Sequence, residues 1–493
     1  MIRFHNLIFI LLVPVATVAV ICSLQSVSAK NKALRKKAVA YSVAKKNKPI
    51  ALSGKSRKSL RKRGAPPITR VQIVSDTMLA EGTRLINFIF GRQRHNVFAL
   101  ELDVDSPNAE LEVVKSLDAA GGLERVIDIT RRFDSCCNRT VVAAVNANFW
   151  RAYRNLAIGP LVVDGEVVQM LNYKQWSSAF FDEKGRMTID RYSMSGTLRS
   201  ANGSLPVVSV NYRRDSLGVC VYNRFSGREI PSISQKSVEQ AFEELRLNSL
   251  MLGDDSTEIT LDIEQMKNDI ARAKLEADAE YGLVKAQVRY LEKPIVNRPA
   301  RCVVDSVAPG AVTIPANGCV LSFGIDCALQ NIPRVGDTLA LQFTTIPNSG
   351  QPYKWAVSGT PRLMRNGAAK HEAAIEGVTS KRFIRNNLAR TAIGTNKNRS
   401  KNILVVVQAN NEQGKGADLA QMASIMKQAG AWNALNLDGG GSTRMIATGR
   451  NVFNGDTAST GRRVAAMLAV ILKNKSAAHA EKGKIPENSG GKQ

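Results

Sequence analysis

The chain has 493 residues, 44% of them hydrophobic, which is enough to form a large core and more than one subdomain. Its net charge of +26 would indicate a nucleic-acid partner if the charge were spread along the chain. Residues 1–70, however, contain 16 Lys or Arg and no Asp or Glu, whereas residues 71–493 hold the other 52 basic and all 42 acidic residues. The excess is therefore concentrated at one end, and we expect no nucleic-acid partner.

The N-terminus has the pattern of a secretory signal peptide. Arg3 precedes an apolar run over residues 7–21, and Val27-Ser28-Ala29 has the small residues of a cleavage site. We therefore predict a signal peptide at 1–29 and export to the periplasm or the extracellular space. The alternative is an uncleaved N-terminal helix that anchors the protein, although the apolar run is short for a membrane span.

Residues 30–70 are rich in Lys, Arg, Ser and Ala and end in Gly64-Ala65-Pro66-Pro67, a composition typical of a flexible tether. Such a segment can be a plain solvated linker. The basic run Lys55–Arg63 can instead bind an anionic cell-envelope surface. At the other end, residues 476–493 are polar, and we expect a disordered tail.

Between these ends the pattern predicts an α+β fold, with strand-rich mixed sheets and flanking helices, over residues 71–475. Residues 234–280 are charged, helix-favouring and nearly free of Gly and Pro, which predicts an inserted helical hairpin. The other expected elements lie outside this insertion. They are strands at 85–90, 97–104, 141–145 and 284–290, hairpins at 161–168 and 180–189, a helix at 419–429, and strands at 434–437 and 442–446.

Six cysteines follow the predicted signal peptide, and an even number in an exported protein favours up to three disulfides. The adjacent Cys136 and Cys137 are expected to bond to different partners. The others are Cys220, Cys302, Cys319 and Cys327. No CxxC pair is present and only three histidines follow residue 29, so we expect no metal site and no cofactor.

The segment Asn436–Thr443 has a composition that folding alone does not explain. Asp438 ends an apolar strand and is followed by Gly439, Gly440, Gly441 and Ser442. Three successive glycines cost chain entropy, so the bare backbone must serve an unusual turn or a close approach by a ligand. A phosphate-binding P-loop is excluded because no Gly-Lys-Ser/Thr follows. The segment is either an active-site floor or a turn stabilised by the Asp438 side chain.

Two other segments place polar side chains at strand ends. Asn146 and Asn148 follow the apolar strand at 141–145, and Arg390 begins the small-residue strand Arg390-Thr-Ala-Ile-Gly394. Taken singly, the asparagines can be turn caps and the arginine a solvated strand edge.

Taken in order, these motifs resemble the phosphodiester glycosidase family. The resemblance covers residues 85–475, interrupted by the predicted insertion, and includes the segment 303–341. It is carried by the motifs Val145-Asn-Ala-Asn-Phe-Trp150, Arg390-Thr-Ala-Ile-Gly394, Ala434-Leu-Asn-Leu-Asp-Gly-Gly-Gly-Ser442, Asn454 and Gly461-Arg-Arg-Val-Ala465. It implies hydrolysis of a sugar-1-phosphodiester, between the anomeric carbon and the phosphate oxygen, in envelope or extracellular glycans.

The resemblance also implies roles for particular residues. Asp438 would act at the anomeric carbon as a nucleophile, a base for water or a stabiliser of positive charge. The catalytic set would be completed by phosphate-binding arginines, Arg390 and Arg463. Substrate contacts would come from Asn146, Asn148, Gly439, Gly440, Gly441, Ser442, Arg462 and Asn454. Because a phosphodiester leaves as a stable anion, a second, protonated carboxylate matters less than in ordinary glycosidases; Glu376 and Glu412 are the candidates for one.

The sequence departs from the family's pattern at two places. Ala147 and Asn148 stand where the family usually has glycines, and Gln408-Ala-Asn-Asn411 replaces an Asp-Gly-Arg segment. These differences leave a second function class open, a non-catalytic protein that binds glycans or the cell envelope through the same cleft.

Overall fold

The computed structural model describes residues 71–137, 139–151, 154–213, 217–231, 280–410, 414–453 and 461–473. The predicted signal peptide, the tether and the C-terminal tail lie outside these residues. Asn454 and Glu412 also lie outside the described residues. The predicted helical insertion lies outside them too, apart from Glu280.

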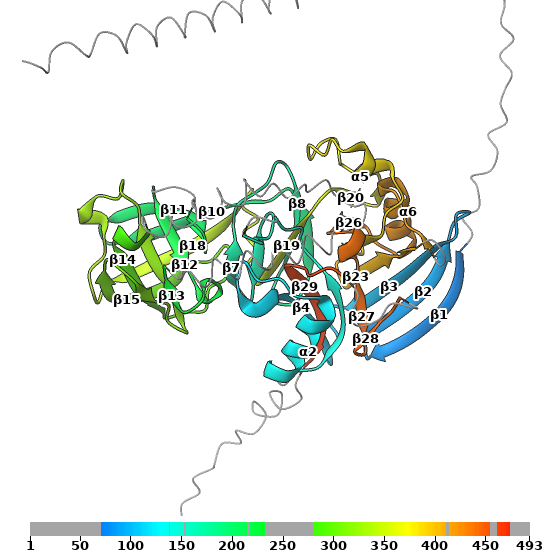
Figure 1. Ribbon diagram of the computed structural model, residues 1–493, viewed down its shortest axis with the longest axis horizontal. Helices are drawn as coiled ribbons and strands as arrows, with labels where there is room; N and C mark the ends of the chain where they lie inside the picture. The colour runs from blue at the N-terminus through cyan, green and yellow to red at the C-terminus, as the bar shows by residue number, and fades with distance from the viewer. Residues whose placement is uncertain are drawn as a thin grey trace, which may run out of the picture. The chain divides into compact units, whose positions relative to one another are not determined.

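The largest sheet has eight strands in the order β1-β2-β3-β23-β22-β26-β20-β21, and each neighbouring pair is antiparallel. The helix α6 (Leu419–Gln428) lies beside β20 (Figure 1). Its apolar side chains belong to the core on this side of the sheet, and a capping box of Asp418 and Gln421 fixes its start. The strands are β1 (Val71–Ala80), β2 (Thr83–Phe90), β3 (His95–Asp103), β20 (Arg362–Arg365), β21 (Ala368–Ala369), β22 (Arg390–Thr395), β23 (Lys401–Val407) and β26 (Asn433–Asn436).

A second, five-stranded antiparallel sheet has the order β28-β27-β5-β29-β4. Its central strand β5 (Val141–Asn146) is buried at every position and is covered by α2 (Val126–Cys137). Leu100 and Leu404 of the first sheet share one core with Val145 and Leu468 of the second, so the two sheets pack against each other. The remaining strands are β4 (Ala109–Lys115), β27 (Met445–Ala447), β28 (Arg450–Asn451) and β29 (Ala466–Leu472).

A third sheet, in the order β7-β6-β19-β8-β9, contributes side chains both to this core and to that of a closed barrel. Its strands are β6 (Leu161–Val163), β7 (Glu166–Gln169), β8 (Ser177–Phe181), β9 (Met187–Asp190) and β19 (Trp355–Gly359). The barrel closes in the order β10-β11-β12-β17-β14-β15-β18, with β18 paired to β10 (Figure 1). Its strands are β10 (Ser193–Ser200), β11 (Gly203–Val210), β12 (Val219–Tyr222), β14 (Lys285–Tyr290), β15 (Ala300–Ala308), β17 (Gly318–Phe323) and β18 (Thr338–Ile346).

Short elements complete the described part of the chain. They are the helix α5 (Lys381–Arg385), the paired strands β13 (Glu229–Ile230) with β16 (Val312–Thr313) and β24 (Ala409–Asn410) with β25 (Gly414–Lys415), and the 3-10 turns η1 (Ser116–Asp118), η2 (Arg224–Ser226), η3 (Leu329–Asn331) and η4 (Gly440–Ser442).

The strand-rich architecture with flanking helices is confirmed. Both predicted hairpins form, as β6–β7 and β8–β9, and the predicted helix at 419–429 is α6. The strand predicted at 442–446 is displaced, because η4 occupies residues 440–442 and β27 begins at Met445. No described helix has both the length and the apolarity needed to cross a membrane.

The predicted disulfides are wrong for this structure, in which all six cysteines are free. Cys220, Cys302 and Cys319 are buried in barrel strands, where a thiol packs as a small apolar side chain. Cys136 and Cys137 were expected to bond to different partners. They instead lie beside each other at the end of α2, exposed, with their sulfur atoms 3.1 Å apart.

Candidate functional site

Asp438 lies where the two large sheets meet. Asn436 ends β26, which pairs with β22, and the next residue donates its amide to the Thr391 carbonyl at 2.8 Å. The Asp438 amide then donates to the carbonyl of Ala147, just past the end of β5, at 3.1 Å. The backbone therefore leaves the first sheet and contacts the second at the residue that carries the carboxylate.

The side chain of Asn146, at the end of β5, holds this junction together. Its Nδ2 donates to the Asp438 carbonyl at 2.7 Å. Its Oδ1 accepts from Thr391 Oγ1 at 2.7 Å and from the Arg444 amide at 3.1 Å. Asn146 is fully buried, so both ends of its amide are committed to protein groups on three segments.

The glycine run forms a turn that brings backbone close to its neighbours. The Gly440 amide donates to the Ala389 carbonyl at 2.8 Å, and a Cβ at Gly439 would lie 2.9 Å from that same oxygen. Gly440 has φ +58, in the left-handed region that favours glycine. Gly441 uses its carbonyl to accept the Arg462 amide at 3.2 Å. The run thus joins the start of β22 to the segment that precedes β29.

Burial sets the charge state of the Asp438 carboxyl group. The residue is 9% exposed, and desolvation raises its pKa to about 6. The Ser442 hydroxyl, the Arg462 guanidinium and the Gly439 amide, which donates to Oδ1 at 2.9 Å, oppose that rise. Asp438 is therefore ionised at neutral pH but close to protonation, which suits a base or a nucleophile.

The three predicted arginines have different surroundings. Arg462 is near enough to Asp438 to lower its pKa, and Arg463 beside it is half-buried, with no hydrogen bond or ion pair in the described part of the chain. Arg390 is 1% exposed and donates from Nε to the Ala417 carbonyl at 2.9 Å and from Nη2 to the Phe383 carbonyl at 2.6 Å. Desolvation lowers the pKa of Arg390 to about 10.

Four buried oxygen atoms on the two chain segments that meet at Asp438 have no hydrogen-bond partner among the described residues. They are Asn148 Oδ1, Asn436 Oδ1, Ser442 Oγ and Thr443 Oγ1. Ser442 Oγ is near enough to Asp438 to lower its pKa, but it lies outside normal hydrogen-bond geometry. An unpaired buried polar atom costs free energy, so these atoms are candidate contacts for a polar ligand. Asn436 and Thr443 were not among the predicted site residues, although they flank the predicted run.

Glu376, a candidate second carboxylate, is fully buried in a separate network. It accepts from Ser177 Oγ and Thr360 Oγ1, each at 2.7 Å, and from the Arg362 amide at 2.8 Å. Desolvation raises its pKa, and the three donors oppose that rise. The Thr360 carbonyl accepts from Asn436 Nδ2 at 2.7 Å, so this network adjoins the strand that carries Asp438.

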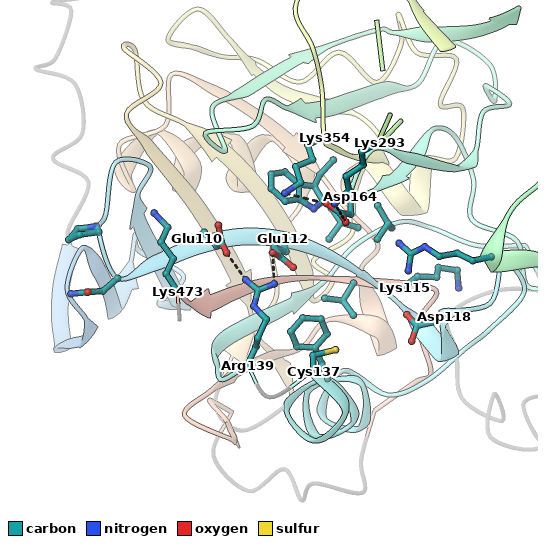
Figure 2. A pocket seen from close by; sticks show the side chains of 18 residues that line it. Glu110, Glu112, Lys115, Asp118, Cys137, Arg139, Asp164, Lys293, Lys354 and Lys473 are labelled. Carbon is teal, nitrogen blue, oxygen red and sulfur yellow. Dashed lines mark hydrogen bonds and ion pairs between the residues drawn. The ribbon is translucent and has the colours of Figure 1, made fainter. Parts of the chain in front are cut away.

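A separate hollow of about 930 Å³ lies over β4, and none of the predicted site residues lines it (Figure 2). Its charged side chains are largely paired with one another. Arg139 contacts Glu110 and Glu112, and Asp164 contacts Lys293 and Lys354. The hollow is the weaker candidate, because its charged groups are paired, whereas four buried oxygen atoms on the segments at Asp438 have no described partner. No group of three metal-ligating side chains occurs among the described residues.

Comparison with known proteins confirms the resemblance. Residues 303–471 match the family model described as phosphodiester glycosidase. A curated relative is the N-acetylglucosamine-1-phosphodiester alpha-N-acetylglucosaminidase of Bos taurus, 34% identical over 136 residues. That alignment covers 26% of this chain, and the chain spans only 25% of the relative's length. Arg390, Asp438 and Arg463 lie inside the region that the family model matches.

Solved structures share the fold over most of the chain. A hypothetical protein from Synechocystis superposes with a TM-score of 0.56 and 20% identity, over 83% of this chain and 64% of that one. A candidate exported protein from Burkholderia pseudomallei K96243 has a TM-score of 0.52 and 14% identity, over 82% of this chain and 97% of that one. At these identities the similarity concerns the fold alone.

Proposed function

We propose that this protein hydrolyses sugar-1-phosphodiester bonds, with Asp438 as the group that acts at the anomeric carbon. The observation that carries the proposal is the nearly buried carboxyl group of Asp438 at the junction of two sheets, with its pKa raised by burial and opposed by the Arg462 guanidinium. The family match over residues 303–471 supports the reaction class.

The reaction breaks the bond between the anomeric carbon and the phosphate oxygen. The electron pair leaves with the phosphate, and water supplies the hydroxyl group that the sugar gains. The leaving phosphate is already a stable anion. The proposed cleavage therefore needs one carboxylate at the sugar and positive charge at the phosphate, without a second, protonated carboxyl group. Ionised Asp438 stabilises the developing positive charge on the sugar or attacks it, while Arg462 and Arg463 bind the departing phosphate.

We propose different parts for the other predicted residues. The oxygen atoms of Asn148 and Ser442 that lack a described partner support a role in contacting sugar hydroxyls. The open space beside Gly440 supports a close approach of the substrate to the glycine run. Asn146 and Arg390 are committed to protein groups, so they position Asp438 and the start of β22. Asn454 remains a predicted substrate contact outside the described residues.

The natural substrates we propose are envelope or extracellular glycans, reached after export through the signal peptide at 1–29. The N-terminal composition supports export. The basic run Lys55–Arg63 would then hold the protein at an anionic envelope surface. Retention on envelope fractions at rising salt, with and without residues 30–70, tests this role.

A second candidate function is glycan binding without turnover. The observation that favours it is the replacement of family glycines and of an Asp-Gly-Arg segment, here Ala147-Asn148 and Gln408-Ala-Asn-Asn411. Gln408 is 5% exposed and accepts from Asn96 Nδ2 at 3.2 Å, so its side chain has a partner within the protein.

The test uses the chain without residues 1–29 and the methyl diester of α-N-acetylglucosamine-1-phosphate. We expect sugar release by the wild type, loss of release in Asp438→Asn, and unchanged release in the control Glu183→Gln, which alters an exposed carboxylate. Equal release by wild type and Asp438→Asn would reject the role of Asp438. Saturable binding of a panel of such diesters without turnover would favour the binding function.

A further inference from the structure

Four aromatic side chains from three separate segments form a continuous cluster, which we term the aromatic platform. Phe149 follows β5, Tyr173 and Trp176 lie between β7 and β8, and Phe383 is in α5. The Phe149 ring centroid is 5.3 Å from that of Trp176 and 6.2 Å from that of Phe383, and Tyr173 is 5.1 Å from Trp176. All four rings are only half-buried, so each retains exposed surface.

The aromatic platform adjoins the Asp438 site along two paths. Phe149 directly follows Asn148, whose Oδ1 lacks a partner, and Ala147 before it accepts the Asp438 amide. On the other side, the Phe383 ring lies 4.9 Å from the Arg390 guanidinium. The residue before Arg390 accepts the Gly440 amide. The rings therefore adjoin both segments that accept hydrogen bonds from the Asp438 turn, at Ala147 and at Ala389.

Positive charge surrounds these rings. The Arg151 guanidinium lies 5.1 Å from the Tyr173 ring centroid, and the Lys174 ammonium lies 5.4 Å from it. On α5, the neighbours of Phe383 include the exposed residues Lys381, Arg382 and Arg385. The surface is thus both aromatic and basic.

We propose that the aromatic platform binds a second sugar ring of the substrate, beyond the ring whose phosphodiester is cleaved at Asp438. Partly exposed, rigid rings offer flat apolar faces to the C–H faces of a pyranose, and they lose little conformational entropy on binding. The substrate is then an oligosaccharide or polysaccharide with a phosphodiester, and the surrounding cations favour an anionic glycan. This inference rests on the proposed function for the position of the first ring.

A basic aromatic surface can also contact an anionic bilayer. The rings here pack edge to face against one another, and none is fully exposed. Fixed, half-buried rings suit a flat ligand better than insertion among lipid chains, which requires apolar groups that project from the surface. The geometry therefore favours a carbohydrate as the ligand of the aromatic platform. The experiment must also be able to detect binding to a bilayer.

The experiment measures binding in the Asp438→Asn background, so that turnover plays no part. The probes are the methyl diesters of N-acetylglucosamine-1-phosphate and of chitotriose-1-phosphate, titrated by calorimetry. We expect Trp176→Ala to weaken trisaccharide binding about tenfold, which is the loss of about 1.4 kcal/mol, and to leave the monosaccharide affinity unchanged. Trp176→Phe should retain most of the affinity, and Tyr173→Ala should lose part of it.

Tyr281→Ala is the matched control, because Tyr281 is 59% exposed and outside the cluster. Equal trisaccharide affinities in Trp176→Ala, Tyr173→Ala and the Asp438→Asn parent would overturn the proposal. So would equal losses for both probes, or binding to phosphatidylglycerol vesicles, rather than to the trisaccharide, that depends on these rings. If the wild type released no sugar from either probe while trisaccharide binding still depended on Trp176 and Tyr173, the aromatic platform would be supported and the hydrolase rejected.

Discussion

Asn146 Nδ2 donates a 2.7 Å hydrogen bond to the carbonyl oxygen of Asp438, across a sequence separation of 292 residues. The other end of the same amide accepts two further hydrogen bonds, so one buried side chain fixes the backbone position of the carboxylate.

We predict that Asn146→Ala destabilises the fold by about 2–4 kcal/mol, because it leaves several buried groups unpaired. It should also lower kcat at least about tenfold, since Asp438 loses its support. Urea unfolding and sugar release measure the two effects. Asn402→Ala is the control: Asn402 is also buried and donates to the Gly185 carbonyl at 2.9 Å. A similar loss of kcat in both variants would show that activity merely follows stability.

The raised pKa of Asp438 predicts a fall in kcat/KM on the acid side, centred near pH 6, where the carboxylate becomes protonated. The Arg462 guanidinium lowers that pKa, so Arg462→Gln should move the midpoint to higher pH. Arg463→Gln should lower the rate and leave the midpoint in place. A pH–rate profile with an unmoved midpoint in Arg462→Gln would contradict this electrostatic role.

The same pKa predicts a stability effect of opposite sign to that of an ordinary ion-paired carboxylate. Because the folded-state pKa, about 6, exceeds the ordinary aspartate pKa of 3.8 in the unfolded chain, the folded protein loses stability relative to the unfolded chain as pH rises from 4 to 6. Above pH 6 this penalty is constant, at about 3 kcal/mol. Asp438→Asn should therefore be more stable than the wild type at pH 7 but not at pH 4. Urea unfolding at pH 4 and at pH 7 measures this difference in stability, with Glu183→Gln as the control variant.

Substitution of Glu376 tests whether a second carboxylate takes part in the proposed hydrolysis. Its oxygen atoms accept three hydrogen bonds from the protein, and a Gln side chain would set its amide protons against one of these donors. We predict that Glu376→Gln loses about 2–4 kcal/mol of stability and retains kcat at a temperature where it is folded. A selective loss of kcat in the folded variant would instead identify the second carboxylate.

The thiols should fall into two reactivity classes. Cys136 and Cys137 are exposed, although desolvation and the adjacent Cys136 thiol raise the pKa of Cys137 to about 11. Burial raises the pKa of Cys220 to about 11 and that of Cys302 to about 12. Maleimide labelling of the native protein, read by peptide mass, should therefore modify Cys136 first and spare the barrel cysteines. Early labelling of Cys220 or Cys302 would contradict the burial described for the barrel.

Local sequence patterns predicted the elements better than their arrangement. Alternating and continuous apolar runs identified β5, the β6–β7 hairpin and α6, because burial on one or two faces leaves a periodic signal. The closed barrel had no such signal. Its closure depends on the pairing of β10 with β18, whose residues are more than a hundred positions apart. The cysteines show the same limit, since their even number says nothing about their packing inside barrel strands.

The sequence indicated which residues belong to the candidate site. Their contacts with one another came only from the structure. Asp438 and the glycines were visible as an entropically costly run at a strand end. That Arg390 donates to the carbonyls of Ala417 and Phe383, rather than lying open as a solvated edge, depends on how α5 and the turn before α6 fold back. The aromatic platform was equally hidden, because its rings come from three separate segments.

The hydrogen bond between Asp438 and Ala147 affects when the candidate site can form during synthesis of the chain. A ribosome delivers β5 almost three hundred residues before it delivers Asp438, so the candidate site is absent from every nascent chain that stops before residue 438. Contacts of such long range are slow to form because a large loop must close first. The candidate site is therefore complete only once β26 and the glycine run have joined β5, and residues 303–471 expressed alone would lack β5 and the amide that positions the carboxylate.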